Sequence, residues 1–295
     1  MGRILFVINP VAGRGKAKNL IPLIREIMDK YNREYEIILT TKPKEAIYIA
    51  EENSDIYDIV TAVGGDGTVN EVAKGLIRKG RGTLGIIPGG TGNDMIKSLG
   101  ISTDPREALE ILNKGFKKDI DIGKIDGHSF FNIASVGFDG EVMLNHDKIR
   151  KIIKGKITYV MAIIYTLLFY KKKKIQIDID GNLLDENIIL LAVGNGKYYG
   201  GGMKILPMSK VDDEYFHICV VSDLGKIKTL FLFPSIFKGN HIKYKRYVKI
   251  YKAKSINIKS QEDLYINVDG EIYPEKKNIK FIIDDAKLNV VCKEG

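Results

Sequence analysis

The stretch IVTAVGGDGTVNEV, residues 59–72, determines the fold class of this 295-residue chain. Ile59 to Val63 has the length and composition of a buried strand, and Val69-Asn70-Glu71-Val72 begins a helical pattern. The glycines between them favour a tight turn, because glycine tolerates close contacts and unusual backbone angles. A strand that runs through a glycine-rich loop into a helix indicates a parallel, doubly wound α/β sheet.

Strands and helices alternate on both sides of this stretch. The expected strands are Ile4 to Asn9, Tyr35 to Thr40 and Leu84 to Ile87, with helices near Lys16 to Tyr31, from Pro43 and from Thr68. From about Asp119 the strand-like runs follow one another closely, which indicates a β-rich second domain. We therefore expect an α/β domain at residues 1–124 and a β-rich domain at residues 125–295.

Composition narrows the class of protein further. A hydrophobic fraction of 44% is ordinary for a globular protein, and the net charge of +9 favours a phosphate-rich ligand, an anionic membrane or nucleic acid. No recognised nucleic-acid motif accompanies the charge, so we expect no nucleic-acid partner. Cys219 and Cys292 lack metal-ligand spacing and favour a reduced, cytoplasmic compartment.

The apolar stretch from Ile157 to Tyr170 falls short of the roughly 20 residues of a membrane-spanning helix. We expect a buried helix packed on the sheet, with a helix lying in the membrane interface as the alternative. The first strand also lacks the apolar core and cleavage site of a signal peptide.

Three loops carry the residue types of a phosphate site. In Gly64-Gly65-Asp66-Gly67-Thr68 the glycines admit phosphate oxygens, Thr68 can cap the next helix, and Asp66 places a carboxylate where Mg²⁺ or a polarised water would bridge phosphates. The loops Asn9 to Gly15 and Pro88 to Asp94 also follow strands. Since strand ends of a parallel sheet meet at one edge, we expect the glycine-rich loops to face one another.

In order along the chain, these segments resemble the catalytic domain of diacylglycerol kinases and sphingosine kinases, and most closely the soluble bacterial lipid kinases. The resemblance continues through Phe131-Asn132…Gly137-Phe138, Gly194-Asn195-Gly196, Pro207 to Asp213 and Val268-Asp269-Gly270-Glu271. It implies an N-terminal domain like those of phosphofructokinase and NAD kinase, a C-terminal β-sandwich-like domain, and an active site between them.

The resemblance also implies an ATP site. The residues that it assigns to ATP are Asn9, Pro10, Val11, Ala12, Gly13, Thr40, Gly65, Asp66, Gly67, Thr68, Val69, Asn70, Glu71 and Thr91. Asp66 is expected to organise the catalytic site, and Arg14 or Lys16 would add positive charge near the phosphates.

A Mg²⁺ site is implied at residues 210–216, held by the Asp213 carboxylate and the carbonyls of Lys210 and Tyr215. One carboxylate with two carbonyls and waters suffices for Mg²⁺. The family usually has glycine after this aspartate, whereas this chain has Glu214. An acidic solvent-exposed turn is the alternative interpretation.

Glu271 matches the family's catalytic base, although spacing alone would give only a β-turn with an exposed glutamate. Two basic runs, Lys171 to Lys174 and a stretch from Lys238 to Lys254, either bind anionic lipid headgroups or form solvated faces.

The expected function is phosphorylation of a membrane-lipid hydroxyl by MgATP, with diacylglycerol converted to phosphatidic acid. The alternatives are kinases of a sphingoid base or phosphatidylglycerol, an NAD kinase, and a nucleotide- or lipid-binding module without activity. We expect peripheral association with an anionic membrane, and the resemblance suggests a homodimer. The sequence does not decide which lipid is the acceptor or which basic run faces the membrane.

Overall fold

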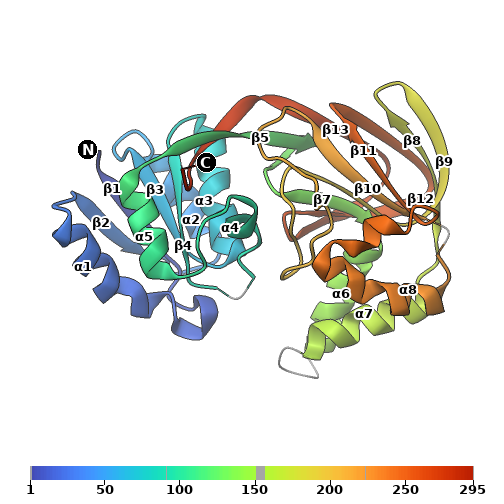
Figure 1. Ribbon diagram of the computed structural model, residues 1–295, viewed down its shortest axis with the longest axis horizontal. Helices are drawn as coiled ribbons and strands as arrows, with labels where there is room; N and C mark the ends of the chain where they lie inside the picture. The colour runs from blue at the N-terminus through green and yellow to red at the C-terminus, as the bar shows by residue number, and fades with distance from the viewer. Residues whose placement is uncertain (1, 91, 151–156, 223, 295) are drawn as a thin grey trace.

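The computed structural model describes residues 2–90, 92–150, 157–222 and 224–294, which form two halves joined by two long strands (Figure 1). The first half comprises β1 (Ile4–Ile8), α1 (Ile21–Lys30), β2 (Tyr35–Leu39), α2 (Glu45–Asn53), β3 (Ile59–Gly64), α3 (Asp66–Lys79), β4 (Thr83–Pro88), α4 (Asp94–Ser98) and α5 (Pro105–Lys114). Its strands lie in the order β2-β1-β3-β4 and are parallel.

The alternation of strands and helices in the first half is as the sequence predicts. Every residue of β1, β3 and β4 is buried, as expected of central parallel strands that are covered on both faces. The sequence did not predict helix α5. Asp104 is its N-cap residue, and the Asp104 side chain accepts hydrogen bonds from the backbone N–H groups of Arg106 and Glu107. Gly115, at φ 72°, ends the helix.

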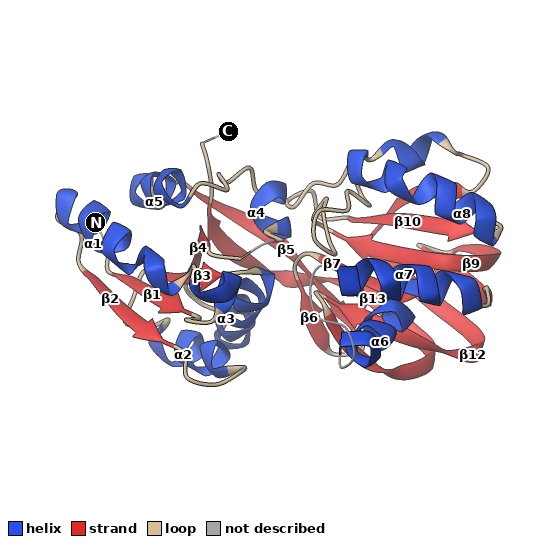
Figure 2. Ribbon diagram, turned by 90° about the horizontal axis from the view of Figure 1, so that it is seen from below, coloured by secondary structure: helices blue, strands red, loops and turns tan. Residues whose placement is uncertain are grey.

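The second half is β-rich with helices on one face (Figure 2). Its elements are β6 (His128–Phe130), β7 (Ile133–Gly137), α6 (Phe138–Arg150), α7 (Ile157–Phe169), β8 (Lys173–Ile179), β9 (Asn182–Gly194), β10 (Phe216–Ser222), α8 (Lys226–Leu232), β11 (Val248–Ala253) and β12 (Ser255–Val268). Two short 3₁₀ segments, η3 (Phe233–Lys238) and η4 (Asn240–Lys243), follow α8.

The long strands β9 and β12 fold the second half back on itself. Each pairs with β7 along one part of its length and with β8 along another. Apolar side chains inside this arrangement form one core, and a separate apolar cluster lies between the sheet and helices α6, α7 and α8. The predicted combination of a doubly wound α/β domain and a sandwich-like β domain is confirmed.

Two strands, β5 (Lys117–Ile125) and β13 (Glu271–Val291), run antiparallel and connect the halves. At 21 residues β13 is about 70 Å long, enough to begin in the second half and end in the first. Its Asn289 and Val290 pair with β4, and Val290 and Val291 lie in the core of the first half. The ranges 1–124 and 125–295 remain a prediction, but the last residues of the chain complete the first sheet.

A buried ion pair links the two connecting strands. Asp121 of β5 is fully buried, and its carboxylate contacts the Lys287 ammonium of β13 at 2.5 Å and accepts the Glu214 N–H at 2.7 Å. Lys287 keeps a side-chain exposure of 29%. The pair therefore holds together the ribbon formed by β5 and β13. At the same point Asp121 contacts the 210–215 turn through Glu214.

We expect Asp121→Ala to lower the free energy of unfolding by about 3 kcal/mol, because it removes two charge-assisted hydrogen bonds and leaves Lys287 with only its longer contact to Glu214 at 3.4 Å. Lys276 also lies on β13 and forms an exposed ion pair with Asp126. Lys276→Met, which breaks this pair, should lower the free energy of unfolding by less than about 1 kcal/mol. Urea unfolding of both variants compares them. Equal losses would show that Asp121 has no special role in the ribbon.

Candidate active site

The loops that the sequence assigns to ATP meet at one edge of the first sheet. Ile8 of β1 is in register with Leu39 of β2 and Val63 of β3, and Gly64 is in register with Pro88 of β4. The residues that follow these strands therefore leave the sheet side by side. This brings together Asn9, Thr40, Gly65 and Gly89, which lie up to 80 positions apart in the sequence.

Three of these loops touch backbone to backbone. Gly89 N–H donates to the Gly64 carbonyl at 2.8 Å. A Cβ added to Gly90 would lie 2.3 Å from Gly65 Cα, and one added to Gly13 would lie 2.1 Å from the Gly89 carbonyl oxygen. Glycine is required at these positions because any side chain would separate the loops.

Asp66 is the first residue of α3, where a negative charge interacts favourably with the helix dipole. Its carboxylate accepts the Asp94 N–H at 2.6 Å, which ties the second glycine loop to the third. The predicted capping role of Thr68 is wrong: Gly65 occupies the N-cap position without a side-chain hydrogen bond, and Thr68 lies one turn further, folded against Gly64.

Asp94 is an acidic residue of the site to which the sequence analysis gave no role. It is buried at the start of α4, and one of its oxygens accepts the Gly201 N–H of the second half at 2.8 Å. Burial, and then the neighbouring charge of Asp66, raise its pKa. Lys97, whose ammonium lies 3.5 Å from the Asp94 carboxylate, compensates part of this negative charge.

The other residues assigned to ATP in the first two loops hold backbone geometry. The Asn9 side chain accepts the Val11 N–H at 3.2 Å, and the buried Thr40 donates its N–H to the Ile8 carbonyl. Pro10 precedes a 3₁₀ turn, η1 (Ala12–Gly15), which is followed by Lys16. Arg14 and Lys16 are exposed and have no ion pair among the described residues. These two cations are therefore available to a phosphate.

The remaining assigned residues lie on the first two turns of α3. Gly67 has open space where a Cβ would stand, and Val69 is buried in the first core. Asn70 is buried and its Nδ2 lies 3.5 Å from the Asp269 carbonyl of the second half. Glu71 accepts the Lys44 N–H, and burial raises its pKa. The predicted contact of Thr91 with ATP falls outside the described residues.

Glu271 lies against α3 rather than against the glycine loops. One of its carboxylate oxygens contacts the Lys74 ammonium at 2.9 Å and accepts the Tyr273 hydroxyl hydrogen bond at 3.1 Å. Burial raises its pKa, but the hydrogen bond and charge of Lys74, together with the smaller effects of Tyr273 and Lys44, outweigh burial, so the net pKa is lowered from that of an ordinary glutamate. Glu271 is therefore ionised at neutral pH, as a proton acceptor must be.

Asp66, Asn70 and Lys74 form one stripe along α3, since residues four apart share a helix face. The stripe faces the turn between β12 and β13, because Asn70 contacts Asp269 and Lys74 contacts Glu271. Lys74 lies eight residues after Asp66, which corresponds to about 12 Å along the helix axis. Asp66 begins α3, and Glu271 of β13 contacts Lys74 further along the same helix. The two predicted catalytic carboxylates are therefore not in contact with each other.

The turn that carries Glu271 is held by Asp269, another residue without a predicted role. Its buried carboxylate accepts the backbone N–H groups of Phe131, Asn132 and Ile133 at 3.1, 3.2 and 2.9 Å. Burial raises the pKa of Asp269 to about 6, although these hydrogen bonds oppose the rise. Residues 131–133 and the turn Asp269-Gly270-Glu271 are thus joined by hydrogen bonds.

The predicted Mg²⁺ turn keeps the backbone that a glycine would give, because Glu214 adopts φ 60° in the left-handed region. One oxygen of Asp213 contacts Lys252 at 3.0 Å and His217 at 3.2 Å, whereas the other is buried without a hydrogen-bond partner among the described residues. That orphaned oxygen fits a cation ligand. The carbonyls of Lys210 and Tyr215 remain predicted ligands. No cluster of three or more acidic, histidine or cysteine side chains occurs in the described part of the chain.

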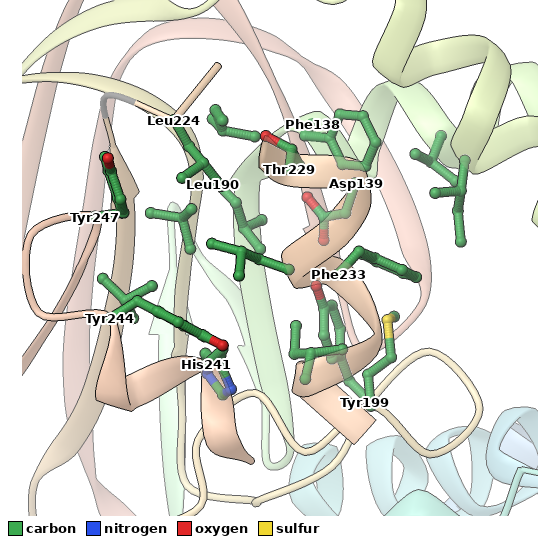
Figure 3. A pocket seen from close by; sticks show the side chains of 18 residues that line it. Phe138, Asp139, Leu190, Tyr199, Leu224, Thr229, Phe233, His241, Tyr244 and Tyr247 are labelled. Atoms are coloured by element: carbon green, nitrogen blue, oxygen red, sulfur yellow. The ribbon is translucent and has the colours of Figure 1, made fainter. Parts of the chain in front are cut away.

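An apolar pocket of about 90 Å³ lies in the second half, between the sheet and helices α6, α7 and α8 (Figure 3). The side chains that line it include Phe138, Leu190, Tyr199, Leu224, Phe233 and Tyr247. Asp139 is the one carboxylate among its lining residues. It is buried, accepts hydrogen bonds from Ser135, Asn267 and the Gly140 N–H, and has a pKa raised by burial.

A hydrogen-bond path connects this pocket to the Glu271 turn. Asn267 donates from Nδ2 to Asp139 at 3.2 Å and accepts the Gly270 N–H on Oδ1 at 3.0 Å. Gly270 directly precedes Glu271. Asp139 in the pocket wall and the turn that carries Glu271, the predicted proton acceptor, are therefore linked through Asn267.

The two-domain fold of this chain is shared with solved NAD kinase and diacylglycerol kinase structures. An NAD kinase from Archaeoglobus fulgidus, solved in complex with ATP, superimposes with a TM-score of 0.57 over 99% of this chain and 94% of its own at 14% identity, which shows a shared fold. A diacylglycerol kinase structure from Bacillus anthracis superimposes with a TM-score of 0.74 at 24% identity, covering 99% of this chain and 97% of its own.

Sequence comparison identifies the family. The diacylglycerol kinase catalytic domain matches residues 3–125, and the YegS C-terminal NAD kinase beta sandwich-like domain matches residues 132–291. The diacylglycerol kinases of Staphylococcus aureus strains RF122 / ET3-1 and MRSA252 are each 34% identical over 98% of this chain and 91% of their own length. The chain belongs to the diacylglycerol kinase family, as its sequence motifs predict.

The contact between Gly65 and Gly90 yields a test of the loop arrangement. Gly90→Ala should lower the free energy of unfolding by about 1–3 kcal/mol, because its Cβ would overlap the Gly65 backbone. Displaced loops should also bind ATP at least tenfold more weakly, measured by calorimetric titration. In the matched variant Gly67→Ala the added Cβ meets no atom within 4 Å, so stability should be retained. Wild-type stability and affinity in Gly90→Ala would show that the loops do not need this contact.

Proposed function

We propose that this protein transfers the γ-phosphoryl group of ATP to the hydroxyl of a membrane lipid, with diacylglycerol as the acceptor and phosphatidic acid as the product. The observation that supports a lipid over other acceptors is the apolar pocket with a single buried carboxylate at its wall. Family membership supports the kinase chemistry, and the pocket supports the class of acceptor.

The pocket favours a lipid over NAD as the acceptor. A nucleotide has a charged diphosphate and several ribose hydroxyls, which need polar partners, whereas this pocket is lined mainly by aliphatic and aromatic side chains. Its 90 Å³ is below the roughly 300 Å³ of common ligand pockets. An acyl chain therefore enters only when α8 and η3, which contribute Leu232, Phe233 and Ile236 to the lining, move outward.

The donor would bind at the edge of the first sheet. The glycine loops expose backbone N–H groups and the start of α3 to the phosphates, as at other phosphate sites on helix N-termini. Arg14 and Lys16 add positive charge beside the first loop. Mg²⁺ would be held near Asp66 and Asp94, and a second ion by Asp213; when bound, the metal neutralises charge on the triphosphate.

Transfer breaks the bond between the γ-phosphorus and the bridging oxygen of ADP and forms a bond to the lipid oxygen, whose proton passes to a carboxylate. Glu271 is the proposed acceptor, because it is ionised and its turn is hydrogen-bonded to the pocket through Asn267. The lipid hydroxyl would reach it from the Asp139 end of the pocket. Rotation of the second half about the ribbon of β5 and β13 would shorten the distance between Glu271 and the phosphates.

Incubation with labelled ATP and a panel of acceptors tests the reaction. Diacylglycerol, a sphingoid base, phosphatidylglycerol and NAD are supplied separately, and the labelled product is identified by chromatography and mass spectrometry. We expect labelled phosphatidic acid as the main product. Labelled NADP would replace the proposal with an NAD kinase, and the absence of any product would favour a binding module.

Asp66→Asn is the control for this assay, since it keeps the shape of the side chain but removes its charge. Product formation should fall at least a hundredfold in the folded variant, the scale expected when a key electrostatic group is lost. Equal activity in both proteins would indicate a contaminating kinase or a site elsewhere.

The role of Glu271 can be tested by pH dependence. Lys74→Met removes the largest of the interactions that lower the Glu271 pKa and leaves the opposing effect of burial, so the pKa should rise. Because a general base must be ionised, the acid limb of kcat/KM should move to higher pH, while Lys74→Arg should retain the wild-type profile. Glu271→Gln should reduce turnover by roughly 10²- to 10⁴-fold with little change in ATP affinity. An unchanged acid limb in Lys74→Met would exclude Glu271 as the base.

A further inference from the structure

Helix α7 is apolar on both sides. Its buried face packs Ala162, Ile163 and Leu167 against the second half. The opposite face carries Met161, Ile164, Tyr165, Leu168 and Phe169, whose exposure ranges from 38% to 67%. The expectation of a buried helix is therefore wrong for this face. An exposed helix surface is normally polar, so a continuous apolar one marks a place where something else binds.

Helix α8 lies beside α7 and extends the apolar surface (Figures 1 and 2). Lys226 of α8 donates a hydrogen bond to the Leu168 carbonyl of α7. Ile227, Leu230 and Phe231 are 75%, 50% and 77% exposed. The inner side of the same segment lines the apolar pocket through Leu232, Phe233 and Ile236. One short segment thus separates the pocket from the surface.

The chain segments that form and flank these helices are rich in positive charge. Residues 157–174 and 224–254 contain thirteen lysines and arginines and no acidic residue. Removing these thirteen charges from the net +9 leaves −4 for the rest of the chain. Several of the lysines on strands are ion-paired, among them Lys173 with Glu262 and Lys249 with Glu186.

Six basic side chains in and after α8 form no ion pair within the described part of the chain. Among the described residues, no ion pair involves Lys226, Lys228, Lys238, Lys243, Lys245 or Arg246, all of which are exposed. Lys228 and Arg246 instead lie against the Tyr247 ring. The apolar surface is consequently bordered by cations that internal carboxylates do not neutralise.

We propose that α7 and α8 form the face by which this protein docks on an anionic membrane, with the apolar side chains entering the boundary between headgroups and acyl chains and the basic residues contacting lipid phosphates. Apolar side chains flanked by lysines match the two layers of such a surface. No helix of the described residues is long and apolar enough to cross a membrane, so this contact would be peripheral.

Docking through this face also has a consequence for the pocket. The segment from Lys226 to Lys238 would lie at the membrane surface, with its inner side chains on the pocket. Outward movement of the segment would then open the pocket directly to lipid. This consequence rests on the proposed lipid kinase function, whereas the docking itself does not.

Vesicle flotation with the full chain, without ATP, tests the docking. We expect binding to vesicles of phosphatidylcholine and phosphatidylglycerol in equal parts, weaker binding as salt rises, and little binding to phosphatidylcholine alone. The double variant Ile227→Ser/Phe231→Ser should bind the anionic vesicles at least tenfold more weakly. Burial of each such side chain contributes about 1.5–3 kcal/mol, and tenfold corresponds to about 1.4 kcal/mol.

The matched control is Ile56→Ser/Leu183→Ser, which removes two exposed apolar side chains, 53% and 66% exposed, from other elements. It should bind as the wild type does. A second variant, Lys226→Glu/Lys228→Glu, should lose binding to anionic vesicles while circular dichroism shows that it remains folded. Wild-type binding by both α8 variants would overturn the proposal.

A second copy of the chain is the competing occupant of the face. Analytical ultracentrifugation without lipid detects it: a wild-type dimer that Ile227→Ser/Phe231→Ser dissociates, together with no vesicle binding, would replace the membrane by a dimer interface. Phosphorylation of a short-chain, water-soluble diacylglycerol separates docking from chemistry. The α8 variants should retain this activity, and its absence in the wild type would refute the kinase proposal while leaving the docking result valid.

Discussion

The contact between the glycine loops is the constraint on which the rest of the site depends. Gly65 and Gly90 approach so closely that a side chain on Gly90 would overlap the Gly65 backbone, and one on Gly13 would overlap the Gly89 carbonyl in the same way. This packing places the start of α3, and with it Asp66, beside Asp94. Because α3 then runs from that point toward the second half, the loop contact also decides where Asn70 and Lys74 meet the β12–β13 turn.

Polar contacts and apolar packing together position the second half. Asp94 accepts a hydrogen bond from Gly201, Asn70 lies close to the Asp269 carbonyl, and Lys74 pairs with Glu271. Phe131 and Val211 of the second half also lie in the hydrophobic core of the first half. The ribbon of β5 and β13 remains the continuous connection.

Much of the fold follows from local patterns in the sequence. The strand, glycine loop and helix near residue 64 predict a parallel sheet with its ligand site at the strand ends, and the structure has that arrangement. The dense strand signals after residue 119 likewise predict the β-rich half. Local patterns fail where the environment decides: α7 has the composition of a core helix, yet one face stays exposed because the sheet covers only the other.

The site was predictable in its residue types but not in its pairings. Asp94 and Asp269 lie within the sequence motifs of the site. Their roles, however, depend on contacts with Gly201 and with residues 131–133, which are distant in the sequence. Lys74 shows no signal in the sequence, because an exposed-looking lysine on a helix is ordinary. At Glu214 the sequence differs from the glycine that the family usually has, but the backbone still adopts the left-handed conformation that a glycine would favour.

The path of β13 also affects how the chain folds during synthesis. Most of the first half is complete by residue 116, but its sheet still lacks the strand segment formed by Asn289 and Val290, and its core lacks Val291. Until those residues leave the ribosome, the edge of β4 stays unpaired and part of the core stays open to water. The nascent first half is therefore exposed to non-native strand pairing throughout translation of the second half. The two halves reach their final structures together, although ATP and lipid are assigned to separate halves.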